Sequence, residues 1–229
     1  HNILEHSYGL SLDEISSVFT NLNQNLTAGY LIEITAIVVN TRTALGSQSL
    51  IDFVDDAAEQ KGTGRWAVEA ALEFNVAIPT IAEAVMSRTL SSNRSLRREV
   101  IGVGLSSRKL SSYDKKKTEA ALTLAIASTF SQGLMLLSSA SESFGAQSLD
   151  RIEVLRTWRQ GCILRCGMVS ALIAAFEGAP NCQNVLSVGN FPEIVKVGLP
   201  ALRTICADAI IGGTPVAGLS SALAYVMQV

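Results

Sequence analysis

The sequence has no extended cluster of positive charge. Its 229 residues carry a formal net charge of −2, and the longest run of consecutive basic side chains is residues 115–117. A protein that binds nucleic acid needs many lysine and arginine side chains on one surface, because contacts to the phosphate backbone supply much of the affinity. We therefore expect no nucleic-acid partner.

The sequence also lacks an unbroken apolar segment of the length that crosses a membrane, which is about 20 residues. The longest apolar segment, residues 122–137, is interrupted by five polar side chains: Thr123, Ser128, Thr129, Ser131 and Gln132. Because 48% of the residues are hydrophobic and 17% are charged, the chain can bury a large core. The sequence thus predicts a buried central helix and no membrane partner.

Patterns typical of metal sites and disulfides are missing as well. No set of the four cysteines and two histidines has the spacing of a zinc site. Cys162 and Cys166 are four residues apart in a segment with a helical pattern, where two side chains have poor geometry for a disulfide. We expect no metal ion, reduced thiols and a cytoplasmic location.

Strand patterns are hard to find, whereas helical patterns recur along the chain, so the predicted fold class is all-α. Ser11 and Glu14 have the spacing of a capping box at the start of a helix. Pro79 suits the first turn of a helix over residues 79–90. Residues 115–143 are long enough for one helix of about seven to eight turns.

Two other segments lead to more specific expectations. Residues 28–39 are apolar on almost every side, which is typical of a helix that is buried all round. Residues 150–176 predict two helices with a hinge near Gly161.

A faint internal repeat points to a duplicated helix set. When the chain is shifted by 138 positions, residues 71–85 align with residues 209–223 and most of their apolar positions coincide. Three polar residues of the first copy then fall opposite apolar residues of the second: Lys61, Thr63 and Arg88 opposite Leu199, Ala201 and Val226. A purely structural role would not require this difference, so the contrast favours a site in the first copy.

The stretch "KGTGRWA" at residues 61–67 has three interpretations. A dinucleotide fingerprint needs a preceding strand within a βαβ unit, but residues 53–60 are acidic and helical in pattern. A Walker loop ends in Gly-Lys-Ser/Thr, whereas here the lysine comes first. The third interpretation is an anion site, in which free N–H groups at a helix start and Lys61 face the anion. Its alternative is a glycine turn whose cations are only solvated.

A second polar group lies at the beginning of the sequence. On a helix, His1 and Glu5 share one face, with Asn2 beside them. An imidazole, an amide and a carboxyl group in this arrangement could orient a polyol and transfer a proton. The alternative is a frayed polar helix end.

Taken together, these residues resemble the all-helical domain of the 6-phosphogluconate dehydrogenase family. The family pattern Lys-x-x-His-Asn-Gly-x-Glu-Tyr matches at His1, Asn2 and Glu5, and its Lys-Gly-Thr-Gly-Lys/Arg-Trp motif is present at residues 61–66. Four further segments are similar to the family in the same order: residues 31–35, 81–92, 131–137 and 158–165. The resemblance extends over almost the whole chain, and the family's helical domain is itself built from a duplicated helix set.

The resemblance implies an oxidoreductase of the pentose phosphate pathway. The family oxidises 6-phosphogluconate at C3 with NADP and decarboxylates the 3-keto intermediate to ribulose 5-phosphate. Glu5 would be the catalytic acid that protonates C1 of the enediol after CO2 leaves. NADP would be bound mainly by the family's N-terminal Rossmann domain, so no cofactor-binding residue is expected in this chain. The family also implies a homodimer.

The resemblance implies six substrate-binding residues: His1, Asn2, His6, Lys61, Thr63 and Arg88. His1 and Asn2 would hydrogen-bond the sugar acid. Lys61 and Arg88 would hold the 6-phosphate with Thr63 nearby, so we expect these side chains to converge although Lys61 and Arg88 are 27 positions apart. His6 stands where the family has a phosphate-binding tyrosine.

Some features of the family are not in this sequence. The family's catalytic lysine would stand three residues before His1, and neither the Rossmann domain nor the C-terminal tail is included. We therefore expect residues 1–229 to form the all-helical substrate-binding and dimerisation domain.

Two alternatives remain open at this point. Ile3 replaces the glycine that follows the family's His-Asn pair, and His6 replaces its tyrosine, which favours a non-catalytic dimerisation or anion-binding module. A related β-hydroxyacid dehydrogenase that acts on an unphosphorylated acid is the other alternative. The pair of Lys61 and Arg88 argues against it, because such a substrate has no phosphate for them to bind.

Overall fold

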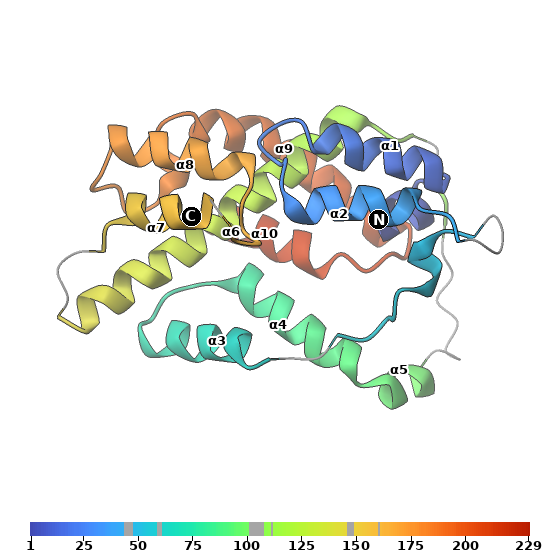
Figure 1. The fold of residues 1–229 in the computed structure, drawn as a ribbon, viewed down its shortest axis with the longest axis horizontal. Coiled ribbons are helices and arrows are strands. Elements are labelled where there is room, and N and C mark those ends of the chain that lie inside the picture. Colours follow the sequence, from blue (N-terminus) through green and yellow to red (C-terminus); the bar gives the residue numbers. More distant parts are fainter. Residues whose placement is uncertain (44–47, 59–60, 101–107, 111, 146–148, 160) are drawn as a thin grey trace.

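The computed structural model describes residues 1–43, 48–58, 61–100, 108–110, 112–145, 149–159 and 161–229. Within these ranges every regular element is helical, which confirms the all-α prediction. The elements, labelled in Figure 1 where space allows, are η1 (Ile3–Ser7), α1 (Leu12–Leu22), α2 (Tyr30–Asn40), η2 (Leu50–Phe53), α3 (Thr63–Glu73), α4 (Pro79–Ser92), α5 (Arg94–Val100), α6 (Lys115–Ser143), α7 (Arg151–Arg159), α8 (Gly167–Gly178), η4 (Val185–Ser187), α9 (Phe191–Ile211) and α10 (Ala217–Gln228).

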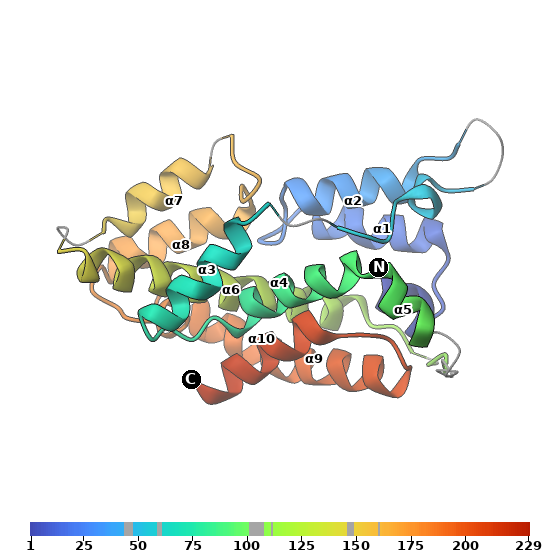
Figure 2. The ribbon, with the colours of Figure 1, turned by 90° about the horizontal axis from the view of Figure 1, so that it is seen from below.

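The helices are arranged around α6, which runs through the middle of the molecule. The pair α1–α2 lies at one end and the pair α7–α8 at the other (Figures 1 and 2). Helices α9 and α10 pack against α6, and α3, α4 and α5 form an outer row beside α6 and α10 (Figures 1 and 2). Thus α4 has one side against the core helices α6 and α10 and the other side towards solvent.

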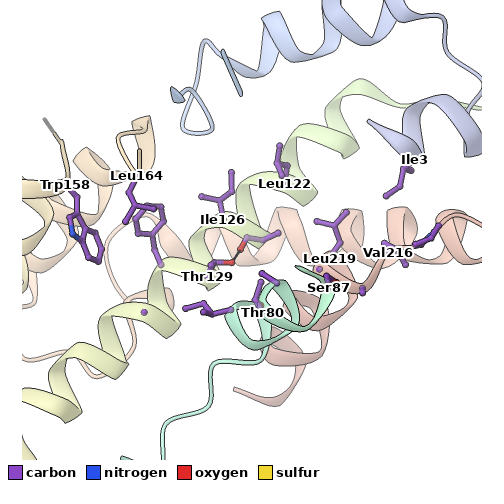
Figure 3. A pocket seen from close by; sticks show the side chains of 18 residues that line it. Ile3, Thr80, Ser87, Leu122, Ile126, Thr129, Trp158, Leu164, Val216 and Leu219 are labelled. Atoms are coloured by element: carbon purple, nitrogen blue, oxygen red, sulfur yellow. Dashed lines mark hydrogen bonds between the residues drawn. The ribbon is translucent and has the colours of Figure 1, made fainter. Parts of the chain in front are cut away.

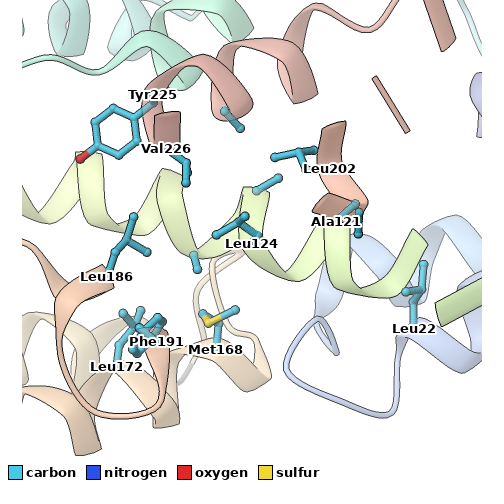
Figure 4. Packing of buried hydrophobic residues seen from close by; sticks show 14 of the residues in the cluster. Leu22, Ala121, Leu124, Met168, Leu172, Leu186, Phe191, Leu202, Tyr225 and Val226 are labelled. Atoms are coloured by element: carbon cyan, nitrogen blue, oxygen red, sulfur yellow. The ribbon is translucent and has the colours of Figure 1, made fainter. Parts of the chain in front are cut away.

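Helix α6 confirms the prediction of a long buried helix over residues 115–143. Its buried side chains include Leu124, Ala127 and Leu134, and Figure 4 shows Leu124 facing Leu202 of α9. A β-carbon on Gly198 of α9 would lie 2.6 Å from the β-carbon of Leu124, so the glycine permits close packing of the two helices. By length and composition α6 could also cross a membrane, but half of its most apolar window is buried inside the fold.

Local signals in the sequence mark the helix starts correctly. The Ser11 hydroxyl accepts a hydrogen bond from the Glu14 amide (3.4 Å), and the Glu14 carboxylate accepts one from the Ser11 amide (2.8 Å). This capping box opens α1, as predicted. Pro79 is the first residue of α4, where its missing N–H costs no hydrogen bond.

The helix bounds confirm the duplicated helix set. Helix α3 ends at Glu73 and α9 at Ile211, while α4 begins at Pro79 and α10 at Ala217, so both pairs are related by the shift that the sequence repeat predicted. With the same shift, α1 falls on α7 and α2 falls on α8. The first copy therefore comprises α1 to α4, and the second comprises α7 to α10.

Two equivalent glycines mark the point where the copies touch. Gly29 directly precedes α2, and Gly167 is the first residue of the equivalent helix α8. The Gly167 amide donates a hydrogen bond to the Ala28 carbonyl (2.7 Å). A β-carbon would lie 2.7 Å from the Arg165 carbonyl oxygen at Gly29, and 2.5 Å from the Asn25 carbonyl oxygen at Gly167. No side chain fits between these backbones, which explains the glycine in each copy.

The prediction that residues 28–39 are buried all round is wrong. The segment does form α2, but Val39 is the helix's one buried residue, and Leu31 and Ile37 are 56% and 52% exposed. Helix α2 packs mainly on α1, with a smaller contact to η2. Hydrophobicity reports that a face avoids water, and it does not tell whether the face is covered within the chain or by a partner.

The helical assignment of residues 162–166 is also wrong. Helix α7 ends at Arg159, and the next helix begins only at Gly167. Gly161 has a left-handed backbone (φ 71°), and Cys166 is extended because it pairs with Gly29 of the other copy. The predicted hinge near Gly161 is therefore an irregular connection. The four cysteines, all of them described, form no disulfide.

Candidate functional site

The N-terminal cluster consists of His1, Asn2, Glu5 and His6, and it lies on the π-helical turn η1. The Tyr8 amide donates to the Ile3 carbonyl (3.1 Å), which is the wide spacing of a π-helix. Such turns are rare and often occur at functional sites.

The Glu5 carboxyl group stands between two imidazoles. Its Oε2 lies 3.5 Å from Nδ1 of His1 and 3.6 Å from Nε2 of His6. The Asn2 Oδ1 is 3.4 Å from the same His1 nitrogen. The other ring nitrogen of His1 is buried and has no hydrogen-bond partner among the described residues. With Glu5 40% exposed, the cluster offers a carboxyl group that can exchange a proton and ring nitrogens that can bind hydroxyl groups.

The residues that follow fix this cluster to the second copy. The hydroxyls of Ser7 and Thr214 are 2.7 Å apart in a buried contact, and the Tyr8 hydroxyl donates to Asp208 (2.7 Å). Burial and the Asp208 carboxylate raise the pKa of the Tyr8 phenol, so it remains a neutral donor. Glu5 therefore sits on a turn that the α9 helix and the α9–α10 connection hold in place.

The glycine loop, residues 61–64, precedes α3. Gly62 has φ 92°, a left-handed conformation that favours glycine. A β-carbon on Gly64 would lie 2.9 Å from Cγ2 of Val85, so this glycine allows α3 to approach α4 closely. Lys61 and Thr63 are exposed beside the first turn of α3, where backbone N–H groups are free to bind an anion.

The glycine loop runs along α4 in the opposite direction. Before the loop, the Ala58 amide donates to the hydroxyl of Ser91 near the end of α4 (3.2 Å). After it, Gly64 contacts Val85. Lys61 lies midway between Ala58 and Gly64, and Arg88 lies midway between Val85 and Ser91. Ala58 and Gly64, on either side of Lys61, therefore both lie against the α4 segment that contains Arg88. The convergence of the Lys61 and Arg88 side chains stays a prediction.

A cavity of about 830 Å³ lies between α4, α6, α10 and η1. Ile3 of η1 and Ser87 of α4 both line it, and Figure 3 shows them at the same end of the cavity. Ile3 lies within the N-terminal cluster's turn, and Ser87 directly precedes Arg88. The rest of the wall is mostly apolar and includes Trp158 and Ile126. Thus one residue adjacent in sequence to each polar region lines the same cavity.

Other interpretations of the glycine loop fail on its surroundings. Of the acidic segment 53–60, residues 59 and 60 lie outside the described residues, and residues 54–58 are irregular rather than helical as predicted. The segment is irregular because Asp55 and Asp56 form ion pairs with Arg94 and Arg97 of α5. No strand precedes the loop within the described part, so a dinucleotide fingerprint does not fit. Nor does any group of three potential ligands there have the placement of a metal site.

One buried polar residue was missed as a contributor to the site. Gln132 of α6 is fully buried; its Oε1 accepts from the Thr80 amide (2.9 Å) and its Nε2 donates to the Thr80 hydroxyl (3.0 Å). These bonds fasten the start of α4, the helix that carries Arg88. The available signal was a glutamine in the middle of the most apolar segment.

Comparisons with known proteins agree with these features. The family model described as "6-phosphogluconate dehydrogenase, C-terminal domain" matches residues 1–229. The chain is 33% identical to the NADP(+)-dependent, decarboxylating 6-phosphogluconate dehydrogenase of Bacillus subtilis, covering 97% of the chain and 48% of that protein. It is 34% identical to the decarboxylating enzyme of Treponema pallidum, covering 97% and 47%.

A solved structure has the same fold. The Plasmodium falciparum 6-phosphogluconate dehydrogenase, solved in its apo form, with its cofactor NADP+ and with its substrate 6-phosphogluconate, superposes with a TM-score of 0.92 at 28% identity. The match covers 99% of this chain and 50% of that one. The chain therefore spans about half the length of the relatives it matches. On the match over all 229 residues, the chain belongs to the 6-phosphogluconate dehydrogenase family and corresponds to its C-terminal domain.

Proposed function

We propose that residues 1–229 form the substrate-binding and dimerisation domain of a decarboxylating 6-phosphogluconate dehydrogenase. The enzyme would oxidise 6-phosphogluconate with NADP and release CO2 and ribulose 5-phosphate. The observation that carries this proposal is that Ile3, which lies within the turn of the N-terminal cluster, and Ser87, which directly precedes Arg88, line the same cavity. A sugar acid with a carboxylate at one end and a phosphate at the other needs two such polar regions.

The glycine loop binds the 6-phosphate in this proposal. Lys61 supplies a point charge, Arg88 a planar guanidinium, and Thr63 a hydroxyl donor at the first residue of α3. A dianionic phosphate is bound most strongly by charge-assisted hydrogen bonds and by free N–H groups at a helix start. The antiparallel course of the loop along α4 supports a common target for Lys61 and Arg88.

The N-terminal cluster binds the C1 end. After CO2 leaves, the proton of the Glu5 carboxyl group moves to C1 of the enediol, and Glu5 is left as a carboxylate. His1 and His6, each within 3.6 Å of that carboxyl group, stabilise the negative charge when protonated. His1 and Asn2 donate and accept hydrogen bonds at the sugar hydroxyls.

The described residues do not fit a dinucleotide, because no strand precedes the glycine loop among them. We infer that residues outside these 229 bind NADP and supply the base for the C3 hydroxyl. When bound, NADP accepts the hydride from C3. A non-catalytic module is less well supported, because such a role would not need Glu5, Lys61 and Arg88 together.

A homodimer and a cytoplasmic location complete the proposal. Leu31 and Ile37 of α2, Trp66 of α3, and Met86 and Leu90 of α4 are large apolar side chains that are more than half exposed. Exposed apolar surface of this extent is typical of a subunit interface. The four free thiols agree with a reducing compartment.

Calorimetric titration of the chain with 6-phosphogluconate and with gluconate tests the proposed substrate. We expect Lys61→Ala to weaken binding of 6-phosphogluconate by about 10-fold or more, the scale of one charged hydrogen bond, and to leave gluconate binding unchanged. Lys196→Ala, at an exposed lysine of α9, is the matched control and should change neither. Equal affinity of the unmodified chain for both compounds would contradict the proposal.

A further inference from the structure

Arg97, which lies outside the motif segments named above, connects the segment before the glycine loop with α4. The Arg97 Nη1 donates to Oδ2 of Asp56 (2.8 Å), and its Nη2 donates to the Ser91 carbonyl (2.9 Å) and the Asp56 carbonyl (3.3 Å). One guanidinium thus joins a side-chain carboxylate, the backbone ahead of the loop and the last turn of α4. Arg94 adds an ion pair to Asp55 and a longer one to Asp56 (3.8 Å).

This contact differs from an ordinary surface ion pair. Exposed pairs contribute little to stability because water screens them, and the Asp56 side chain is indeed 68% exposed. However, Arg97 also satisfies two backbone carbonyls, one of them at a helix end, where carbonyls lack partners within the helix. Its hydrogen bond lowers the pKa of the Asp56 carboxyl, so the pair stays ionised around neutral pH.

The contact fixes where the glycine loop begins relative to α4. From Asp56 the chain passes Ala58, whose amide donates to the Ser91 hydroxyl (3.2 Å), and reaches Gly64 against Val85. Lys61 lies between these anchors. If the first anchor is released, the loop can shift along α4, and Lys61 loses its fixed position relative to α4. Misplacement of a binding group by about 1 Å can lower catalytic efficiency by about 100-fold.

We propose that Asp56 and Arg97 are positioning residues that set the preference for a phosphorylated over an unphosphorylated sugar acid. The proposal rests on the function proposed above, because it assumes that Lys61 and Arg88 bind the phosphate. Neither Asp56 nor Arg97 touches the substrate. They act through the register of the glycine loop on α4.

A merely structural role makes a different prediction. Residues 54–56 and 58 are exposed and contribute no side chain to the buried core, so loss of the contact should leave the fold intact. If the contact served stability alone, any loss of binding would affect the sugar acid and the phosphate equally. A positioning role affects only ligands that carry phosphate.

The test is a double-mutant cycle of Asp56→Asn and Arg97→Gln in the 229-residue chain. Titrations use three probes: 6-phosphogluconate, inorganic phosphate and gluconate. We expect each single variant to bind both phosphate-containing probes about 5- to 30-fold more weakly, which is in the range of coupling between neighbouring residues. Gluconate binding should be unchanged. The double variant should bind these probes no more weakly than the single variant with the lower affinity, because the two residues act as one unit. Arg97→Lys should recover part of the affinity.

Arg156→Gln is the matched control, because Arg156 also bridges two exposed carboxylates, Glu153 and Glu177, far from the loop in sequence. This variant should have unchanged affinity for all three probes. Unchanged phosphate affinity in Arg97→Gln, or equal losses for all three probes, would overturn the positioning role. Lys61→Ala separates the two proposals: if it abolishes the preference for phosphate while Arg97→Gln does not, only the positioning role fails. If Lys61→Ala has no effect, the proposed phosphate site fails and the positioning role with it.

Discussion

The two copies of the helix set share one backbone plan and use it differently. In the second copy, α8 and α9 bury many side chains, and α10 buries Ala222, Tyr225 and Val226. In the first copy, α3 buries one side chain, and α4 buries none. Val226 is buried where the first copy has the exposed Arg88. In these last two helices the second copy packs the core and the first copy presents polar groups, whereas in the first helix the contrast is reversed, because α1 buries four residues and α7 buries one.

Helices α2 and α8 show the same contrast at a second place. Leu31 and Ile37 of α2 are exposed, whereas the equivalent residues of α8, Val169 and Ala175, are buried in the core. Both helices are apolar, but α8 is covered within the chain and α2 is not. The comparison teaches that duplication conserves hydrophobic pattern more strictly than it conserves the environment of the pattern.

The largest expected effect is a difference in the free energy of unfolding between substitutions in α8 and in α2. Val169→Asp puts an unpaired charge into the core and should destabilise the chain by about 4 kcal/mol or more. Leu31→Asp should change the free energy of unfolding by less than about 1 kcal/mol and should dissociate the proposed dimer instead. Urea unfolding and sedimentation equilibrium measure both outcomes. Equal destabilisation by the two substitutions would show that α2 is a core helix after all.

The second prediction concerns Glu5, because the residue at the equivalent position of the repeat, Ser143, has no carboxyl group. In an enzyme that contains this chain and a nucleotide-binding half, Glu5→Gln should keep substrate affinity and slow turnover by about 10²- to 10⁴-fold, the usual scale for loss of a general acid. Ser143, which occupies the shifted position at the end of α6, provides the control Ser143→Ala. An unchanged turnover number for Glu5→Gln would remove Glu5 from the mechanism.

Much of the fold follows from local sequence signals, because short-range spacing determines them. The capping box of Ser11 and Glu14, Pro79 at a helix start, and the long helix α6 were all predicted correctly. The internal repeat predicted the positions of α9 and α10 from those of α3 and α4.

The misassigned features depend on long-range contacts. Residues 162–166 are extended or irregular because Cys166 pairs with Gly29, which is distant in sequence. The ion pairs of Asp56 with Arg97 link residues 41 positions apart and leave no periodic signal. The site residues were found through a resemblance to a family motif, and the convergence of Lys61 with Arg88 stays a prediction.

The third prediction tests whether the two copies meet symmetrically. Gly167→Ala forces a methyl group against the Asn25 carbonyl oxygen and should destabilise the chain by about 1 to 3 kcal/mol. Gly29→Ala should cost a similar amount for the equivalent reason. Gly178→Ala, where a β-carbon would have open space, is the control and should be neutral or slightly stabilising. Thermal unfolding distinguishes these results, and tolerance of alanine at Gly167 would contradict the close crossing.

A smaller effect should compare the equivalent helices α1 and α7. Ser11 caps α1, and Asp150 caps α7 by accepting from the amides of Ile152 and Glu153. Ser11→Ala and Asp150→Ala should each cost about 1 kcal/mol in urea unfolding. Hydrogen bonds from the Ser11 amide and hydroxyl lower the pKa of the Glu14 carboxyl, so the α1 cap should lose stability as Glu14 is protonated on acidification. A contribution of Ser11 that does not change with acid would contradict the capping box.

A crystal structure of the chain with 6-phosphogluconate tests the central claim most directly, namely that the first copy binds the phosphate. The account predicts the phosphate at the start of α3, with the Lys61 ammonium and the Arg88 guanidinium both within about 3.2 Å of its oxygens, and the C1 end towards Glu5. A phosphate bound at Lys115, Lys116 and Lys117, with Lys61 and Arg88 pointing to opposite sides of the domain, would contradict it.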